Sequence, residues 1–211
     1  MIEIVPSVVA YSLDEVYQRL SVLEAFSPWA HLDITDGRFA KSVTWQEPSG
    51  LETLAGKIKL EAHLMIETPE TVLPVWFQVV DRVIIHTEST EVLAELVDSM
   101  EGRPSQLGLA LNLETPVKNI LPYLFKINFV HLMSIKEIGH YGEPLNEEIF
   151  AKIKELRGKK PNLIISVDGG VNKTNLKKLV EVGANHLVVG SAIWQAPDPA
   201  KAYQDLHDAL N

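Results

Sequence analysis

The chain has no cysteine among its 211 residues. Disulfide bonds and thiolate metal ligands are therefore excluded, and the composition is compatible with a reducing compartment. Basic residues are also scarce, since 19 Lys and Arg stand against 28 Asp and Glu and give a net charge of −9. We do not expect so acidic a chain to bind nucleic acid, although backbone amides or a metal ion can still attract a small anion.

Long apolar runs are missing as well. No stretch approaches the roughly 20 residues of a membrane-spanning helix, and the opening MIEIVPSVVAYSLDE lacks the basic flank of a signal peptide. We therefore expect a cytoplasmic protein without a membrane partner. The hydrophobic content of 46% suffices for a sizeable core, and no linker divides the chain, so residues 1–211 are expected to form a single domain.

Short apolar runs alternate with amphipathic stretches along the whole chain. Helix signals separate the runs: Ser12 and Glu15 form a capping box, and Thr68 and Asp198 are cap residues before prolines. The alternation predicts an α/β protein with the (β/α)₈ fold of a TIM barrel. An open doubly wound sheet remains the alternative, because alternation alone does not show closure. The eight candidate strands are Ile2–Val5, Trp29–Ile34, Ile58–His63, Val83–His86, Leu107–Leu111, Ile127–Met133, Leu163–Val167 and His186–Val189.

Imidazoles and carboxylates stand where several of these strands end. His31 and Asp33 are two residues apart, so on a strand both side chains point to one face. His63 ends the next strand, and Asp168 follows the seventh. The carboxyl ends of barrel strands meet at one rim, so these four side chains can converge. Two imidazoles and two carboxylates suit one divalent cation such as Zn²⁺, Fe²⁺, Mn²⁺ or Co²⁺.

Seven short motifs extend this pattern over nearly the whole chain. They are Pro6-Ser7, His31-Leu-Asp33-Ile-Thr-Asp36-Gly37, His63-Leu-Met65, His86-Thr-Glu88, Asn112-Leu-Glu-Thr115-Pro116, Val167-Asp168-Gly169-Gly170-Val171-Asn172 and Gly190-Ser191-Ala192-Ile193. In this order they resemble the ribulose-phosphate 3-epimerase family. The resemblance implies a ribulose-phosphate-binding barrel and an isomerase of carbohydrate metabolism. Such an enzyme inverts C3 of a ketose phosphate, by default D-ribulose 5-phosphate to D-xylulose 5-phosphate in the pentose phosphate pathway.

The resemblance also implies roles for individual residues. His31, Asp33, His63 and Asp168 would bind the metal. Asp33 and Asp168 would be the catalytic pair, one removing the C3 proton and the other returning a proton to the opposite face of a metal-stabilised 2,3-enediolate. The family resemblance further suggests a homo-oligomer. Substrate contacts would come from Ser7, His63, Met65, Met133, Gly139, Gly142, Asp168, Gly169, Gly170, Gly190 and Ser191, with the phosphate on backbone amides after strands seven and eight.

Three departures from the family pattern matter, and the third leaves the substrate open. Thr35 stands where the family usually has methionine, and Phe39-Ala-Lys41-Ser42 replaces the family's Phe-Val-Pro-Asn stretch. The segment 134–144 after the sixth strand differs from the family's glycine-rich loop. Gly139 and Gly142 are expected to match two of its three glycines, and we hypothesise that Lys136 or His140 replaces lost amide contacts. An epimerase for a hexulose 6-phosphate, or a non-catalytic sugar-phosphate binder, therefore remains an alternative.

Other histidines receive no catalytic role from the sequence. His86 and Glu88 are expected to support the site rather than to bind the metal. His131, His186 and His207 have no partner pattern along the chain and are interpreted as ordinary residues without a role in the site.

Overall fold

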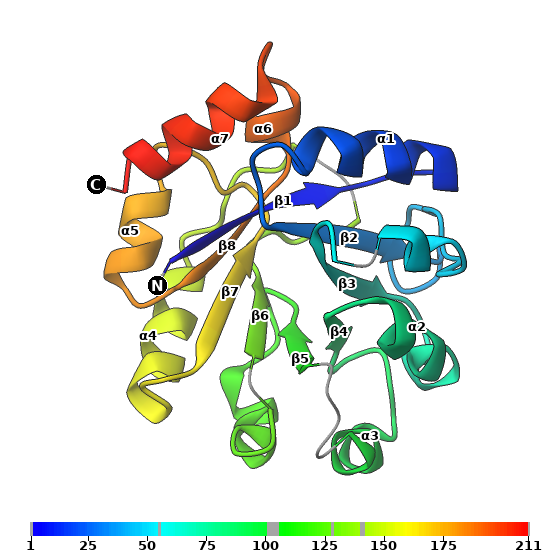
Figure 1. Ribbon diagram of the computed structural model, residues 1–211. Helices are drawn as coiled ribbons and strands as arrows, with labels where there is room; N and C mark the ends of the chain where they lie inside the picture. The colour runs from blue at the N-terminus through cyan, green and yellow to red at the C-terminus, as the bar shows by residue number, and fades with distance from the viewer. Residues whose placement is uncertain (1, 55, 101–105, 128, 140–141, 211) are drawn as a thin grey trace.

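The computed structural model describes residues 2–54, 56–100, 106–127, 129–139 and 142–210. Within them, eight parallel strands pair in chain order and close into a barrel, with β8 beside β1 (Figure 1). The closure confirms the predicted (β/α)₈ fold and excludes the open sheet. The strands are β1 (Glu3–Val8), β2 (Trp29–Thr35), β3 (Lys59–Met65), β4 (Arg82–His86), β5 (Gln106–Leu111), β6 (Phe129–Met133), β7 (Ile164–Asp168) and β8 (His186–Val189).

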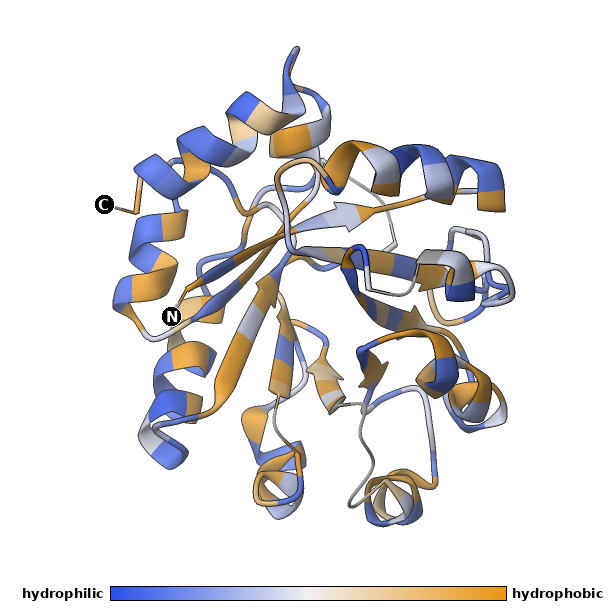
Figure 2. Cartoon of the chain, in the orientation of Figure 1, coloured by the Kyte–Doolittle hydropathy of each residue, from blue (hydrophilic) through white to orange (hydrophobic). Residues whose placement is uncertain are grey.

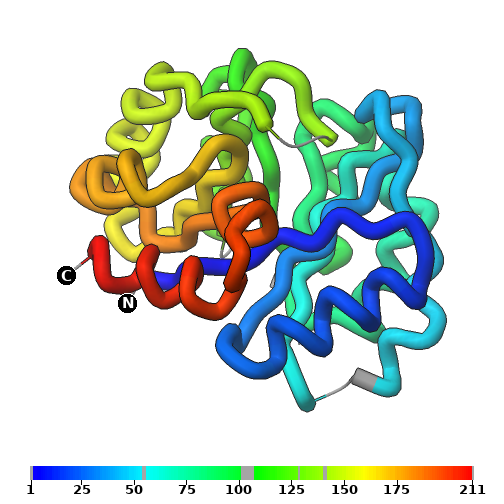
Figure 3. The backbone as a smooth tube through the Cα atoms, turned by 90° about the horizontal axis from the view of Figure 1, so that it is seen from above, coloured from blue at the N-terminus to red at the C-terminus, as the bar shows by residue number. Residues whose placement is uncertain are grey.

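Helices surround the barrel and turn their apolar faces toward it (Figures 1 and 2). They are α1 (Leu13–Leu23), α2 (Leu73–Val79), α3 (Leu93–Ser99), α4 (Ile149–Lys159), α5 (Leu176–Glu181), α6 (Ser191–Trp194) and α7 (Pro199–Asp208). Short 3₁₀ turns lie at Leu51–Leu54, Pro69–Thr71, Val117–Asn119 and Leu121–Tyr123. Seen from above, α7 returns to the side of the molecule where β1 begins (Figure 3). None of the helices in the described ranges combines the length and the apolar character needed to cross a bilayer.

Two of the three predicted helix caps are present. The Ser12 hydroxyl accepts the Glu15 amide at 3.2 Å, and the Asp198 carboxylate accepts the Lys201 amide at 3.0 Å. The prediction for Thr68 was wrong, because this residue has a left-handed φ of 48° and makes no side-chain cap bond. Its backbone N–H donates instead to the Ser89 carbonyl, which joins the loops after β3 and β4.

The strands bury two different faces. Their outward side chains, such as Leu32, Leu60 and Val83, belong to one large apolar cluster shared with the helices. The apolar cluster of the inner face comprises only Ile84, Ala110 and Phe129 among the described residues, with Ile164 packed against it. Most of the remaining inward positions are polar and buried: Ser7, His31, Asp33, Glu61, His63, Arg82, His86, His131, Ser166 and His186. Such groups are costly to bury unless they are paired, so the barrel interior must be a connected polar network.

Candidate active site

Strand register brings the predicted residues to the carboxyl rim of the barrel. Asp33 is the pairing partner of His63 between β2 and β3, and Ser7 is the partner of His31 between β1 and β2. On the other side, Asp168 of β7 pairs with Met133 of β6. Side chains two residues apart share a face, so His31 and Asp33 both point inward, as the sequence predicted.

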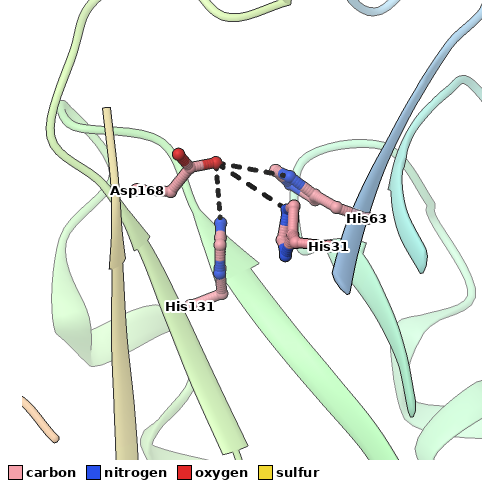
Figure 4. A group of neighbouring side chains, drawn as sticks. All are labelled: His31, His63, His131 and Asp168. Atoms are coloured by element: carbon pink, nitrogen blue, oxygen red, sulfur yellow. Dashed lines mark ion pairs between the residues drawn. The ribbon is translucent and has the colours of Figure 1, made fainter. Parts of the chain in front are cut away.

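Four side chains aim donor atoms at a common point (Figure 4). One donor atom from each of His31, His63, His131 and Asp168 lies within 4.8 Å of the other three. Asp168 Oδ2 lies 3.9 Å from His31 Nε2, 3.7 Å from His63 Nδ1 and 3.4 Å from His131 Nε2. Asp33 borders the same cluster, with Oδ1 3.3 Å from His31 Nε2 and 3.5 Å from His63 Nδ1.

The arrangement of these donor atoms suits binding of one cation better than it suits hydrogen bonds between the side chains. Among the described residues, His31 Nε2, His63 Nδ1, His131 Nε2 and Asp33 Oδ1 are buried and have no hydrogen-bond partner. Buried polar atoms are rarely left unsatisfied in native proteins. Ligand atoms held about 2.0–2.2 Å from one ion lie at most about 4.4 Å apart, and the ion pairs of 3.3–3.9 Å fall within that limit.

The far side of each predicted metal-binding imidazole is held in place. His31 Nδ1 lies 2.6 Å from Oε1 of the buried Glu61. His63 Nε2 lies 2.9 Å from His86 Nε2, and His86 Nδ1 faces Glu88 Oε2 at 3.4 Å. His86 and Glu88 thus support the site from outside it, as the sequence predicted. Partners of this kind fix the tautomer and orientation of a metal-binding histidine.

A second chain of contacts crosses the floor of the barrel. His131 Nδ1 and His186 Nδ1 each lie 2.9 Å from the Ser166 hydroxyl. His186 Nε2 lies 3.2 Å from Glu61 Oε2, which also accepts a 2.6 Å bond from Arg82 Nη1. Glu61 therefore connects the chain through His186 to the bond that holds His31.

Burial and neighbouring charges shift the pKa values of the titratable groups in this cluster. Burial alone lowers the pKa of His31, but Asp33 and Glu61 outweigh it and raise this pKa to about 10. Burial and the charge of Asp33 raise the pKa of Asp168 to about 7. Burial opposes ionisation of Asp33 as well, yet His31 and His63 lower its pKa to about 2. Burial lowers the pKa of His63 to about 3, so this imidazole is neutral and able to bind a metal.

A pocket opens above this cluster. Eleven of the predicted site residues line it: Ser7, Asp33, Met65, Met133, Gly139, Gly142, Asp168, Gly169, Gly170, Gly190 and Ser191. His31 and His63 are fully buried beneath it. Val9, Ile135, Val171 and Val188 add apolar walls, and Glu143 adds a carboxylate. The pocket thus lies above a cluster of donor atoms that could hold a cation, and it has two carboxylates and a glycine-lined side after β7 and β8.

The loop after β6 reaches this pocket through contacts that the sequence did not predict. The Ser42 hydroxyl donates to the Gly139 carbonyl at 2.5 Å, and the Lys41 ammonium lies 3.1 Å from the Glu137 carboxylate. Lys136 lines a neighbouring hollow with Phe39 and Asn112 instead of the pocket itself. His140, the other residue hypothesised to replace amide contacts, lies outside the described residues.

Sequence reasoning missed Glu61, Arg82, His131, Ser166 and His186. The interpretation of His131 and His186 as ordinary was wrong, because both are fully buried in the barrel interior and belong to its polar network. Their signal is period two: Glu61 stands two residues before His63, and Ser166 stands two residues before Asp168. A polar residue at such a position shares the inward face with the known site residue.

The sequence of this chain is similar to those of known proteins. Residues 3–194 match the family model described as the ribulose-phosphate 3 epimerase family. The chloroplastic ribulose-5-phosphate-3-epimerase of Arabidopsis thaliana is 33% identical over 95% of this chain and 74% of its own length. The ribulose-phosphate 3-epimerase of Bacillus subtilis (strain 168) is 30% identical over 98% of both chains.

Solved structures resemble the chain in fold. A 3-hexulose-6-phosphate synthase superposes with a TM-score of 0.73 at 17% identity and covers 100% of both chains. A crystal structure of KGPDC from Streptococcus mutans gives a TM-score of 0.75 at 15% identity over 99% of this chain and 97% of that one. At such identities the likeness concerns the barrel alone.

Proposed function

Because the chain belongs to the ribulose-phosphate 3-epimerase family, we propose that it is a metal-dependent epimerase that inverts C3 of a ketose phosphate. Its default reaction converts D-ribulose 5-phosphate to D-xylulose 5-phosphate. One observation carries the proposal: Asp33 and Asp168 line the same pocket, directly above buried imidazoles whose donor atoms lack partners among the described residues. A sugar-phosphate pocket without catalysis would not need that combination.

The two carboxylates supply the acid and the base of the reaction. Inversion next to a carbonyl requires a proton to leave C3 on one face of the substrate and a proton to return on the other. Asp33 comes from β2 and Asp168 from β7, and β1 and β8 separate these strands in the barrel. A substrate lying between them presents one face to each carboxylate. General acid–base transfer of this kind contributes typically about 10²–10⁴-fold to the rate.

The residues that would hold the cation are His31, Asp33, His63 and Asp168. Zn²⁺, Fe²⁺, Mn²⁺ and Co²⁺ all accept such a mixture of nitrogen and oxygen ligands. When bound, the ion supplies Lewis-acid stabilisation of the negative charge that develops on the substrate oxygens. Its charge also compensates two carboxylates that are otherwise buried side by side in a region of low polarity.

The rest of the pocket binds and shields the substrate. Gly169 and Gly170 have positive φ angles of 104° and 66°, which only glycine adopts without strain and which let the backbone approach a phosphate group. Gly190, directly after β8, and Ser191, the first residue of α6, line the same space. Met65 and Met133 exclude water above the metal-binding floor, and Ser7, Gly139 and Gly142 complete the lining.

Isotope exchange tests the proposal directly. The protein, loaded with each divalent cation in turn, is incubated in D₂O with a panel of pentulose 5-phosphates and hexulose 6-phosphates, and deuterium at C3 is followed by NMR. We expect cation-dependent exchange and a C3 epimer with ribulose 5-phosphate. Exchange only with a hexulose 6-phosphate would show that the enzyme is an epimerase for a hexulose 6-phosphate instead. Absence of exchange with every sugar would favour a non-catalytic binder.

We also propose an oligomeric state and a cellular compartment for the enzyme. It is a homo-oligomer that works in a reducing compartment, the cytoplasm, on a small-molecule substrate. The absence of cysteine supports the compartment, and family membership supports the oligomer. Light scattering coupled to size exclusion tests the assembly, and a monomer at micromolar concentration would contradict it.

A further inference from the structure

His131 of β6 occupies the metal cluster without having been expected there. We propose that His131 is a further metal ligand, so that imidazoles from β2, β3 and β6 hold the same ion. This inference rests on the metal site of the proposed function and enlarges its ligand set. It also gives a role to the polar residues that cross the floor of the barrel.

The position of the ring supports this assignment. His131 is fully buried, and its Nε2 lies 3.4 Å from Asp168 Oδ2. The ring nitrogens of His31 and His63 lie farther from that oxygen, at 3.9 and 3.7 Å. Among the described residues, His131 Nε2 has no hydrogen-bond partner, as is also true of His31 Nε2 and His63 Nδ1. Figure 4 shows these three rings pointing at the Asp168 carboxylate.

The hydrogen-bond chain behind His131 decides whether its Nε2 carries a lone pair. The chain ends at Glu61, which is ionised because it pairs with Arg82 at 2.6 Å and can therefore only accept hydrogen bonds. His186 Nε2 lies 3.2 Å from Glu61 Oε2 and 3.1 Å from Arg82 Nη1, which can only donate. When His186 Nε2 carries the proton and donates it to Glu61, His186 Nδ1 is left to accept from the Ser166 hydroxyl. The Ser166 oxygen then accepts from His131 Nδ1.

With the proton on Nδ1, His131 presents the lone pair of Nε2 to the cluster. The other oxygen of the same carboxylate lies 2.6 Å from His31 Nδ1, so the neutral, metal-binding form of His31 also presents Nε2 as a lone pair. In this arrangement Glu61 sets the tautomers of both His31 and His131. A lone pair that faces a carboxylate oxygen is repulsive unless a cation lies between them.

The remaining buried imidazoles do not share this arrangement. His186 is bonded on both ring nitrogens, to Ser166 on one side and to the Glu61–Arg82 pair on the other. His86 Nε2 contacts His63, and its Nδ1 faces Glu88. Neither residue belongs to the group whose donor atoms lie within 4.8 Å of one another.

A third imidazole changes the expected choice of ion. Nitrogen ligands suit Fe²⁺, Co²⁺ and Zn²⁺, whereas Mn²⁺ is better matched by oxygen ligands. The enlarged set therefore predicts tighter binding of Co²⁺ and Zn²⁺ than of Mn²⁺. The experiments below measure the contribution of His131 to the binding of Zn²⁺ and Co²⁺.

The first experiment uses the wild-type protein with ¹⁵N-labelled imidazoles and Zn²⁺. We expect three metal-bound ring nitrogens by NMR: Nε2 of His31, Nδ1 of His63 and Nε2 of His131. His131 should carry its proton on Nδ1. If the Zn²⁺ form shows a protonated Nε2 on His131, as when Arg82 donates to His186 and reverses the chain, the assignment is overturned.

The second experiment compares His131→Leu with His186→Leu, the same change at another buried imidazole of the barrel. Replacement of a partner behind a ligand costs typically about 10–100-fold in metal affinity, so loss of a direct ligand should cost at least about 100-fold for Co²⁺. His131→Leu should also change the visible absorption of the Co²⁺ form, whereas His186→Leu, which removes a partner behind His131, should lower Co²⁺ affinity by no more than about 10–100-fold. An unchanged Co²⁺ spectrum and affinity in His131→Leu would overturn the inference.

These measurements separate the ligand assignment from the proposed activity. Zn²⁺ bound by three imidazoles without C3 exchange on any sugar would remove the epimerase and leave His131 as a ligand. Exchange with ribulose 5-phosphate while His131 stays unbound would keep the epimerase and refute the further ligand.

Discussion

Nδ1 of His31 lies 2.6 Å from Oε1 of Glu61, and both side chains are completely buried inside the barrel. The other oxygen of the same carboxylate lies 2.6 Å from Arg82 Nη1. The guanidinium of Arg82 is stacked between two aromatic rings, 4.3 Å from Phe129 and 4.7 Å from Trp29. A buried ion pair thus orients a residue of the proposed metal site.

Arg82→Met should therefore destabilise the protein strongly. Removing one partner of a buried ion pair typically costs about 3–5 kcal/mol, because the other charge is left uncompensated. The double variant Glu61→Gln with Arg82→Met should lose much less than the sum of the two single changes. Urea unfolding of the metal-free proteins measures the free energies of unfolding.

An exposed ion pair provides the control. Lys126 and Asp98 are 2.5 Å apart, but their side chains are 43% and 60% exposed. Lys126→Met should cost no more than about 1 kcal/mol. A similarly small loss for Arg82→Met would show that the Glu61–Arg82 pair does not support the barrel.

The barrel could be predicted from sequence because its signals are local. All eight strands lie at the predicted apolar runs, with ends shifted by at most a few residues, and the Ser12 and Asp198 caps form as expected. Thr68 shows the limit of such signals. Its backbone is set by a contact with Ser89 in another loop, and the local pattern carries no information about that contact.

The candidate site was predictable at its rim and not in its interior. His31, Asp33, His63 and Asp168 follow motifs that stand at strand ends. Glu61, by contrast, acquires its role only from the register that places it beside His31 and Arg82. Partners 104 residues apart, such as Arg82 and His186, meet only because the barrel closes. No pattern along the sequence predicts such a pair.

Asp168→Asn should separate chemistry from binding. The amide keeps the shape of the side chain but cannot accept a proton from carbon at a useful rate. With saturating cation, we expect the substrate still to bind, and C3 exchange to fall by at least about 10²–10⁴-fold. Calorimetry measures substrate binding, metal analysis measures the bound cation, and NMR measures C3 exchange.

Asp36→Asn is the matched control for that variant. Asp36 belongs to the loop after β2, where its carboxylate accepts the backbone amides of Arg38, Phe39 and Glu67. We expect this variant to lose some stability and to keep exchange per folded molecule. If Asp168→Asn exchanges C3 as fast as Asp36→Asn, Asp168 is not an acid or base of the reaction.

Gly170→Ala should weaken binding of the phosphorylated substrate. A Cβ atom there would collide with the backbone nitrogen of Leu145 and lie 2.8 Å from the Glu143 carbonyl oxygen. Relief of this clash must displace the segment that borders the pocket. We expect KM for the sugar phosphate to rise at least about tenfold, equivalent to about 1.4 kcal/mol of binding free energy.

Gly142→Ala isolates the steric part of this effect. Gly142 lines the same pocket and also has a positive φ, of 107°, but a Cβ atom there would meet no atom of the described residues within 4 Å. Both variants carry backbone strain, and only Gly170→Ala carries the clash. Equal KM values for the two would mean that contact between Gly170 and the segment 143–145 does not shape the substrate site.

Glu88 should make the protein sensitive to acid. Burial raises the pKa of this carboxyl group, but His86, Thr115 and the Asn112 amide outweigh burial and lower it to about 2. A group whose pKa is lower in the folded state stabilises the fold above its ordinary value of 4.5, and that contribution disappears as the pH falls toward 2. Glu88→Gln lacks the contribution at every pH. The difference in Tm between wild type and Glu88→Gln should therefore be largest near neutral pH and shrink between pH 4.5 and pH 2. A difference that stays constant over this range would show that ionised Glu88 does not stabilise the folded state.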